Sequence, residues 1–335
     1  LSNAASNAKE IRTTIDNYIT SSADFARLGY TFDQSQNLAK VANIYNVVGD
    51  EIADVNEATQ SIISTMKAFD VEADNSISIV DKFNEVGNNF AISSGGIGEA
   101  MTRSASSMAA ANNTMDETIA LITAANTVVQ DAPRVGNAFK TISMRIRGAE
   151  TELEEAGLDA EGMAESTAKL REEIMALSGV DIMIDDDTFK STYQILDELS
   201  AKWQDLTDIQ QASITELIAG KHQGNVMSSL MNNFDIARQV LDVSLNSEGS
   251  AMKEHEKWME SLEARVQKLA ATFQSLSQTF LSSDFLKGLI DGLTSFVDIV
   301  DTVIGKFGVM PALIGAISMA MSFKGNGFIR LNADA

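Results

Sequence analysis

Apolar residues recur at helical spacing along most of this chain, and polar capping residues divide the pattern into segments. The first segment places its apolar residues three and four positions apart, at Ile11, Ile15, Tyr18, Ile19, Phe25 and Leu28. Gly29 follows as a stop signal. A second helix is predicted over residues 31–48, because Thr31 and Gln34 form a capping-box pattern at its start. The spacing predicts an all-α protein of multiple amphipathic helices, either elongated or packed as a helical bundle.

Glycine, proline and helix-capping residues predict further helix boundaries. A helix is expected to stop at Gly87, and the glycine-rich residues 93–98 are interpreted as a flexible joint. Thr114 with Glu117 forms another capping-box pattern. The helix that they open is predicted to end before Pro133, because the residue preceding a proline is disfavoured in the α region.

Residues 129–148, the basic island, interrupt an otherwise acidic chain. Their cationic residues are Arg134, Lys140, Arg145 and Arg147. Phe139, Ile142 and Ile146 form the apolar face of one predicted helix, and Lys140, Arg145 and Arg147 are expected off that face. The helix is expected to continue to Gly157. We interpret the four cations as a candidate interaction site for an acidic partner, or as local partners of the acidic residues that follow.

The charge reverses directly after the basic island. Residues 150–208, the acidic stretch, hold 17 acidic side chains against four basic ones. Within it, residues 178–188 alternate briefly and predict a short strand or a loop. Helices are then predicted near residues 188–204, 207–219 and 233–246.

A narrow heptad seam follows near residues 252–281. Its apolar positions are Met259, Leu262, Val266, Leu269, Phe273, Leu276 and Phe280. Steps of three and four residues repeat over three heptads, which is the pattern of a coiled coil. The seam predicts a partner helix, in the same chain or in another copy.

Residues 307–323 form an uncharged run near the end of the chain. The run includes Phe307, Pro311, Gly315 and Phe323. Its length lies at the lower limit for a membrane-spanning helix. It predicts either a buried hairpin or interhelical core, or a segment that acts on a membrane.

These patterns divide the chain into four regions. We expect an N-terminal helical region at 1–130, a central helical region with the basic island and the acidic stretch at 131–246, long amphipathic or coiled-coil helices at 247–306, and a hydrophobic segment with a truncated tail at 307–335. Residue 1 is Leu and no signal-peptide pattern follows it, so the sequence is expected to be an internal piece of a longer protein.

Composition argues against several function classes. The net charge of −22 disfavours nucleic-acid binding, which depends on clustered Lys and Arg. The absence of cysteine excludes disulfides and thiolate metal sites. No phosphate-loop, nucleophile-elbow or dinucleotide motif occurs, and His222 and His255 lack a second histidine at ligand spacing. We expect no catalytic residues, no cofactor and no metal, and we interpret the Asp185–Asp187 cluster as a solvated turn.

Four segments, in order, resemble the core region of the tail tape measure proteins of long-tailed bacteriophages and prophages. They are Leu28–Ala42 with Val48–Asp50, Asp81–Phe90, Gln130–Gly148 and Gly220–Asn225. The resemblance extends over roughly residues 20–280. One departure is His222, where a basic residue such as Arg is expected.

The resemblance implies a structural virion protein that sets the length of the tail tube and templates tail assembly. It also implies a place in the tail lumen after synthesis in the bacterial cytoplasm, and a role in genome delivery across the host envelope. Implied partners are other copies of the chain, the tail tube protein, tail assembly chaperones, baseplate hub proteins and the host membrane. The uncharged run keeps a second hypothesis open, a membrane-active helical effector or pore-forming protein.

Overall fold

The structure is a computed structural model that describes residues 2–11, 13–261, 265–269 and 271–272. Over these residues the predicted all-α fold is confirmed, and the described part contains no strand beyond one isolated bridge. The chain divides into two units, residues 20–258 and the two terminal segments 1–19 and 259–335. The terminal unit contains α1 (Ser2–Glu10), and the remainder of this section concerns the unit of residues 20–258.

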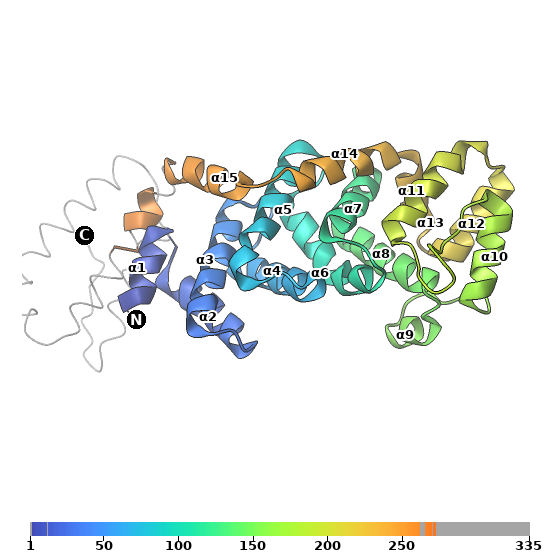
Figure 1. The fold of residues 1–335 in the computed structure, drawn as a ribbon. Helices are drawn as coiled ribbons and strands as arrows, with labels where there is room; N and C mark the ends of the chain where they lie inside the picture. Colours follow the sequence, from blue (N-terminus) through green and yellow to red (C-terminus); the bar gives the residue numbers. More distant parts are fainter. Residues whose placement is uncertain (1, 12, 262–264, 270, 273–335) are drawn as a thin grey trace, which may run out of the picture. The chain divides into compact units, whose positions relative to one another are not determined.

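The helices of this unit follow one another with short connections, apart from the longer segments 156–166 and 179–191 (Figure 1). The first half contains α2 (Ile15–Arg27), α3 (Phe32–Val48), α4 (Val55–Phe69), η1 (Ala73–Asn75), α5 (Ile77–Asn89), α6 (Ser94–Ala110), α7 (Met115–Val129) and α8 (Ala132–Ile146). The second half contains α9 (Glu150–Glu155), α10 (Thr167–Ser178), α11 (Thr192–Lys202), η2 (Trp203–Asp205), α12 (Asp208–Ala219), α13 (Gly224–Asn232), α14 (Phe234–Leu245) and α15 (Ser250–Met259).

Side-chain caps begin several helices, as the sequence predicts. The capping boxes at Thr31 and Thr114 are confirmed, and Ser191 and Thr207 form two more at α11 and α12. In each box the hydroxyl accepts the N–H of the residue three positions on, whose side chain reaches back to the cap. These starts depend on adjacent residues, which explains why a sequence pattern finds them.

The core of the unit is centred on α7. Nearly every residue of α7 from Met115 to Asn126 is buried. Helices α6, α8, α13 and α14 all pack against it. A helix buried on all sides shows little amphipathic contrast, and α7 accordingly has more apolar residues than its neighbours.

The first predicted segment is α2, which begins at Ile15 and ends at Arg27, just before Gly29. One predicted boundary in the first half is wrong. Gly87 does not end a helix, because α5 runs through it to Asn89. Helix interiors accept an isolated glycine at a cost of about 1 kcal/mol, which the packing of a buried helix offsets.

The predicted flexible joint at residues 93–98 is also wrong, because this segment is the first turn of α6. The Ser93 hydroxyl caps the helix by accepting the Gly96 N–H at 3.0 Å. The glycines serve close packing instead. A Cβ atom on Gly95 would lie 2.7 Å from the Asp50 carbonyl oxygen and 2.8 Å from the Glu51 carbonyl oxygen, so only glycine allows α6 this close approach to the loop after α3.

Helix α8 ends earlier than predicted. It stops at Ile146, and Gly148 adopts a left-handed conformation before the separate short helix α9. Pro133 lies in the first turn of α8, as predicted, and Phe139, Ile142 and Ile146 are buried. The segment 178–188 forms a tight turn closed by the Met183–Phe189 bridge. Helix α13, within a region that the sequence pattern left unassigned, is an additional element.

The C-terminal predictions lie mostly outside the described residues. Of the heptad seam, Leu262, Phe273, Leu276 and Phe280 are outside them, whereas Val266 and Leu269 are 38% and 39% exposed. The uncharged run 307–323 is outside them entirely. Among the described helices, none combines the length and apolar character needed to cross a bilayer. The coiled coil, the membrane segment and the four-region division stay predictions.

Candidate functional site

The basic island leads to a buried guanidinium. Arg145 is 1% exposed, although its position in α8 was expected to lie off the packed face, so that expectation is wrong. Its nitrogens donate to four backbone carbonyl oxygens: Glu216 at 2.9 Å, Leu217 at 3.3 Å, Asp159 at 3.0 Å and Glu161 at 3.1 Å. One side chain therefore joins α8 to the end of α12 and to the loop after α9.

The environment of Arg145 explains how a charge is accommodated inside the unit. The carbonyls of Glu216 and Leu217 belong to the last turn of α12, the negative end of that helix. Burial lowers the pKa of the Arg145 guanidinium, and the carboxylates of Asp159 and Glu216 partly offset this effect. The guanidinium keeps its proton, because arginine is not deprotonated in proteins. Arg145 thus acts as a cap, supplied from α8, for the C-terminus of α12.

The loop after α12 closes over this guanidinium. Gly220 has a φ of +70° and lies so close that a Cβ atom on it would be 3.2 Å from Arg145 Nη1. The next residue, Lys221, donates its backbone N–H to Asp159 Oδ2 at 3.1 Å, and its side chain pairs with Glu161. Gly220 and Lys221 therefore complete the set of residues that surround the Arg145 guanidinium.

The other cations of the island occupy different environments. Arg147 stacks over the Phe189 ring at 4.3 Å and donates to the Lys190 carbonyl at 3.2 Å, and burial lowers its pKa. Arg134 is exposed and donates to Asn225 Oδ1 at 3.0 Å. Lys140 is half-buried on α8. The structure does not bring the four side chains together on one surface, and their role toward a partner stays a prediction.

Two of the segments singled out by resemblance meet here. The Gln130–Gly148 segment contacts the Gly220–Asn225 segment twice, through Arg145 beside Gly220 and through Arg134 with Asn225. Sequence reasoning found both segments but not the contact between them. The basic island contacts the acidic stretch mainly through backbone oxygens of that stretch. The number of charged residues in each segment does not predict contacts of this kind.

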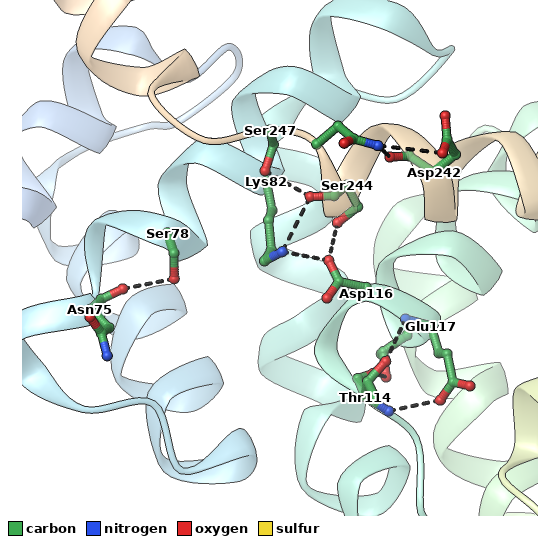
Figure 2. A network of polar contacts seen from close by, with 11 residues as sticks. Asn75, Ser78, Lys82, Thr114, Asp116, Glu117, Asp242, Ser244 and Ser247 are labelled. Atoms are coloured by element: carbon green, nitrogen blue, oxygen red, sulfur yellow. Dashed lines mark hydrogen bonds and ion pairs between the residues drawn. The ribbon is translucent and has the colours of Figure 1, made fainter.

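A second polar network links α5, α7 and α14 (Figure 2). Lys82 Nζ lies 2.6 Å from Asp116 Oδ1 and 3.2 Å from the Ser244 carbonyl oxygen. The Ser244 hydroxyl donates to the same Asp116 oxygen at 2.6 Å. The Lys82 and Asp116 side chains are 15% and 14% exposed, so this ion pair is shielded from water. Sequence analysis quoted the Asp81–Phe90 segment but assigned it no contact.

No arrangement of side chains in the described part of the chain points to a reaction centre. An open groove of about 610 Å³ beside Gly220 has a mixed polar lining that includes Trp203, Asp208, Thr215, Glu216, Lys221 and Asn232. His222 is exposed, and His255 stacks on Trp258 with ring centroids 5.7 Å apart. The described residues contain no group of three His, Cys, Asp or Glu side chains that could hold a metal ion. Asp185–Asp187 form an exposed turn.

Comparison with known proteins identifies a family. Residues 3–220 match the protein-family model described as phage-related minor tail protein, which is more than half of the chain. The match contains the whole of the first three segments quoted above and ends at Gly220, beside Arg145. No solved structure matches the chain.

Proposed function

We propose that this chain, which belongs to the phage-related minor tail protein family, is the tape measure protein of its tail. Family membership makes it a structural protein of a phage tail. The observation that supports the finer assignment is the ordered series of four segments, two of which pack on each other around Arg145. The proposed activity is to set the length of the tail tube and to template its assembly.

The helical fold suits a measuring role. An α-helix rises ~1.5 Å per residue, so a chain that is helical throughout gains length in proportion to its residue number. The short connections between helices leave few irregular stretches in residues 20–258. In this proposal the compact unit is one state of the chain and an extended form inside the tail is the other.

The proposed partners are those of a protein enclosed in a tube. We propose contacts with other copies of the chain, the tail tube protein, tail assembly chaperones and baseplate hub proteins, in the tail lumen after synthesis in the bacterial cytoplasm. The net charge of −22 supports an absence of specific nucleic-acid binding, because phosphate backbones repel such a chain. The proposed role is structural, without catalysis, cofactor or metal.

An in-frame deletion tests the measuring function. Removing residues 262–289, a whole number of heptads, should shorten assembled tails by on the order of 40 Å if the segment is helical in the tail. Tail length is measured by electron microscopy of particles from the phage or prophage that carries the gene. As a matched control, the same residues are replaced by an unrelated helix-forming sequence of equal length, which should leave tail length unchanged.

The two variants distinguish control of tail length from a general requirement of the chain for tail assembly. Tails of unchanged length in the deletion variant would refute the proposal. Shortened tails in the equal-length variant would also count against it, because sequence and not length would then control the tube. A second deletion of twice the size should double the shortening.

The proposed aid to genome delivery rests on the uncharged run 307–323. A run of this length is near the minimum for spanning a bilayer, so the chain should release dye from liposomes more readily than a version truncated after Lys306. Equal leakage from both versions would refute the proposed membrane contact but would not bear on the control of tail length. Strong leakage without any effect of deletions on tail length would instead favour a membrane-active helical effector or pore former.

A further inference from the structure

Helix α14 packs against α7 and α5, and α15 follows it along the top of the view in Figure 1. We call residues 234–258 the strap. Its first half is attached by apolar packing, because Phe234, Ala237 and Val240 of α14 are buried. Burying such side chains stabilises the contact by about 1.5–3 kcal/mol for each large one. Helix α14 is therefore a firm part of the unit.

The attachment changes in character where α14 ends. The buried residues of α15 are Ser250, Ala251 and His255, whereas Met252 is 40% exposed. Around residues 244–251 the polar contacts to α5 and α7 are hydrogen bonds, and two of them go to the Lys82–Asp116 ion pair between those helices. We call this group of contacts the latch.

The centre of the latch is the carboxylate of Asp81 on α5, which is 5% exposed. Its Oδ1 accepts the backbone N–H of Ala251 at 2.8 Å, and its Oδ2 accepts the N–H of Gly249 at 3.1 Å. The first N–H groups of a helix have no partner within the helix, and a carboxylate at that end is favoured by the helix dipole. Asp81 thus caps α15 from another helix.

Two neighbours of Asp81 extend the latch. The Asn84 amide donates to the Ser250 hydroxyl oxygen at 2.9 Å, and that hydroxyl donates to Glu85 Oε2 at 2.6 Å. On the α14 side, the Lys82–Asp116 pair holds Ser244 through both its carbonyl and its hydroxyl (Figure 2). Four of the five consecutive residues 81–85 of α5, all except Phe83, therefore supply polar partners to residues 244–251.

Polar attachment has a different energetic consequence from apolar attachment. When a hydrogen bond opens to water, both groups find new partners, so the net loss is about 0.5–1.5 kcal/mol for a neutral pair and about 1.5–3 kcal/mol for a bond to a charged group such as the Asp81 carboxylate. When an apolar contact opens, the exposed apolar surface forms no favourable interaction with water that would offset the lost contact. Helix α15 should therefore detach at lower cost than α14.

We propose that the latch is a release point, at which α15 separates from α5 while residues 20–243 stay folded. The release would detach the last helix of the unit of residues 20–258 from the helices before it. The latch is a property of the fold and holds whether or not the chain measures tail length. Its function is to let one end of a compact unit extend first.

Hydrogen exchange of the full chain tests the latch. In the Asp81→Ala variant the amides of Gly249 and Ala251 lose their acceptor and should exchange roughly 10- to 100-fold faster, since a hydrogen bond to a charged group is among the stronger ones. Amides in the middle of α7 should exchange at the rate of the unchanged protein. Exchange is followed by mass spectrometry of peptides from both regions.

Two further variants keep the test decisive. Ser250→Ala removes the contacts with Asn84 and Glu85 from the strap side and should accelerate the same amides by a smaller factor without risk to the core. Glu248→Ala removes a charge from an exposed position on the same connection and should change nothing. Unchanged rates at Gly249 and Ala251 in the first two variants would overturn the proposal. Equal acceleration in α7 would overturn it too, because the strap and the core would then open together.

Discussion

The Arg145→Met substitution should lower the free energy of unfolding of the 20–258 unit by about 3–5 kcal/mol, a loss typical of breaking a buried polar network. Methionine fills a similar volume but donates no hydrogen bond. The carbonyl oxygens of Leu217, Asp159 and Glu161 would lose their Arg145 donor. Leu217 and Asp159 are partly buried, and a buried acceptor left without a donor costs about 1–3 kcal/mol. Denaturant unfolding followed by circular dichroism measures the change.

Two companion variants identify the cause of that loss. Arg145→Lys keeps the charge, but one ammonium group cannot donate to all four carbonyls as the planar guanidinium does. Most of the destabilisation should therefore persist. Arg134→Ala, an exposed member of the same island, should shift stability by less than about 0.5 kcal/mol. If Arg145→Met were as mild as Arg134→Ala, the cap on α12 would contribute little and the interpretation would be wrong.

The Gly136→Ala substitution should destabilise the unit by about 2–4 kcal/mol, the range of an overpacked core position. In an ordinary exposed helix the same change stabilises by about 1 kcal/mol, so the sign is reversed here. A Cβ atom on Gly136 would lie 2.6 Å from the Ala100 carbonyl oxygen and 2.8 Å from Ala100 Cα. Because both are backbone atoms, α6 and α8 would have to move apart along their contact.

Another helical glycine provides the control for that prediction. Gly224 begins α13, and a Cβ atom on it would meet only the Thr215 Cγ2 methyl, at an ordinary contact distance of 3.4 Å. Gly224→Ala should therefore be neutral or slightly stabilising. Thermal unfolding midpoints of the two variants, measured side by side, would contradict the packing argument if they moved in the same direction.

The sequence predicted features whose causes are local. The capping boxes at Thr31 and Thr114 and the proline in the first turn of α8 depend on residues within a few positions, and all were found. The buried face of α8 followed from helical spacing, because Phe139, Ile142 and Ile146 repeat at three and four. The all-α class followed from the sum of such patterns.

Features that depend on distant residues could not be predicted. The charge of Arg145 suggested exposure, and only the positions of Glu216 and Asp159 in space make its burial favourable. Residues 93–98 resembled a joint because glycine is common in loops. Their role in close packing depends on the backbone oxygens of Asp50 and Glu51, more than forty positions earlier. Asp81 likewise gave no signal of its capping role, because its partners, Gly249 and Ala251, belong to a helix far along the chain.

The lengths of the helices bear on what an extended form of this chain would require. The described helices run from 6 residues in α9 to 17 in α3 and α6. Isolated helices shorter than about 12–15 residues are marginal in water, whatever their caps. Once drawn out of the bundle, α11, α12 and α13 would lose their folded form unless another surface took the place of their neighbours. A single extended copy without contacts would therefore be flexible. Lateral contact with the tube wall or with parallel copies would make it stiff enough to define a length.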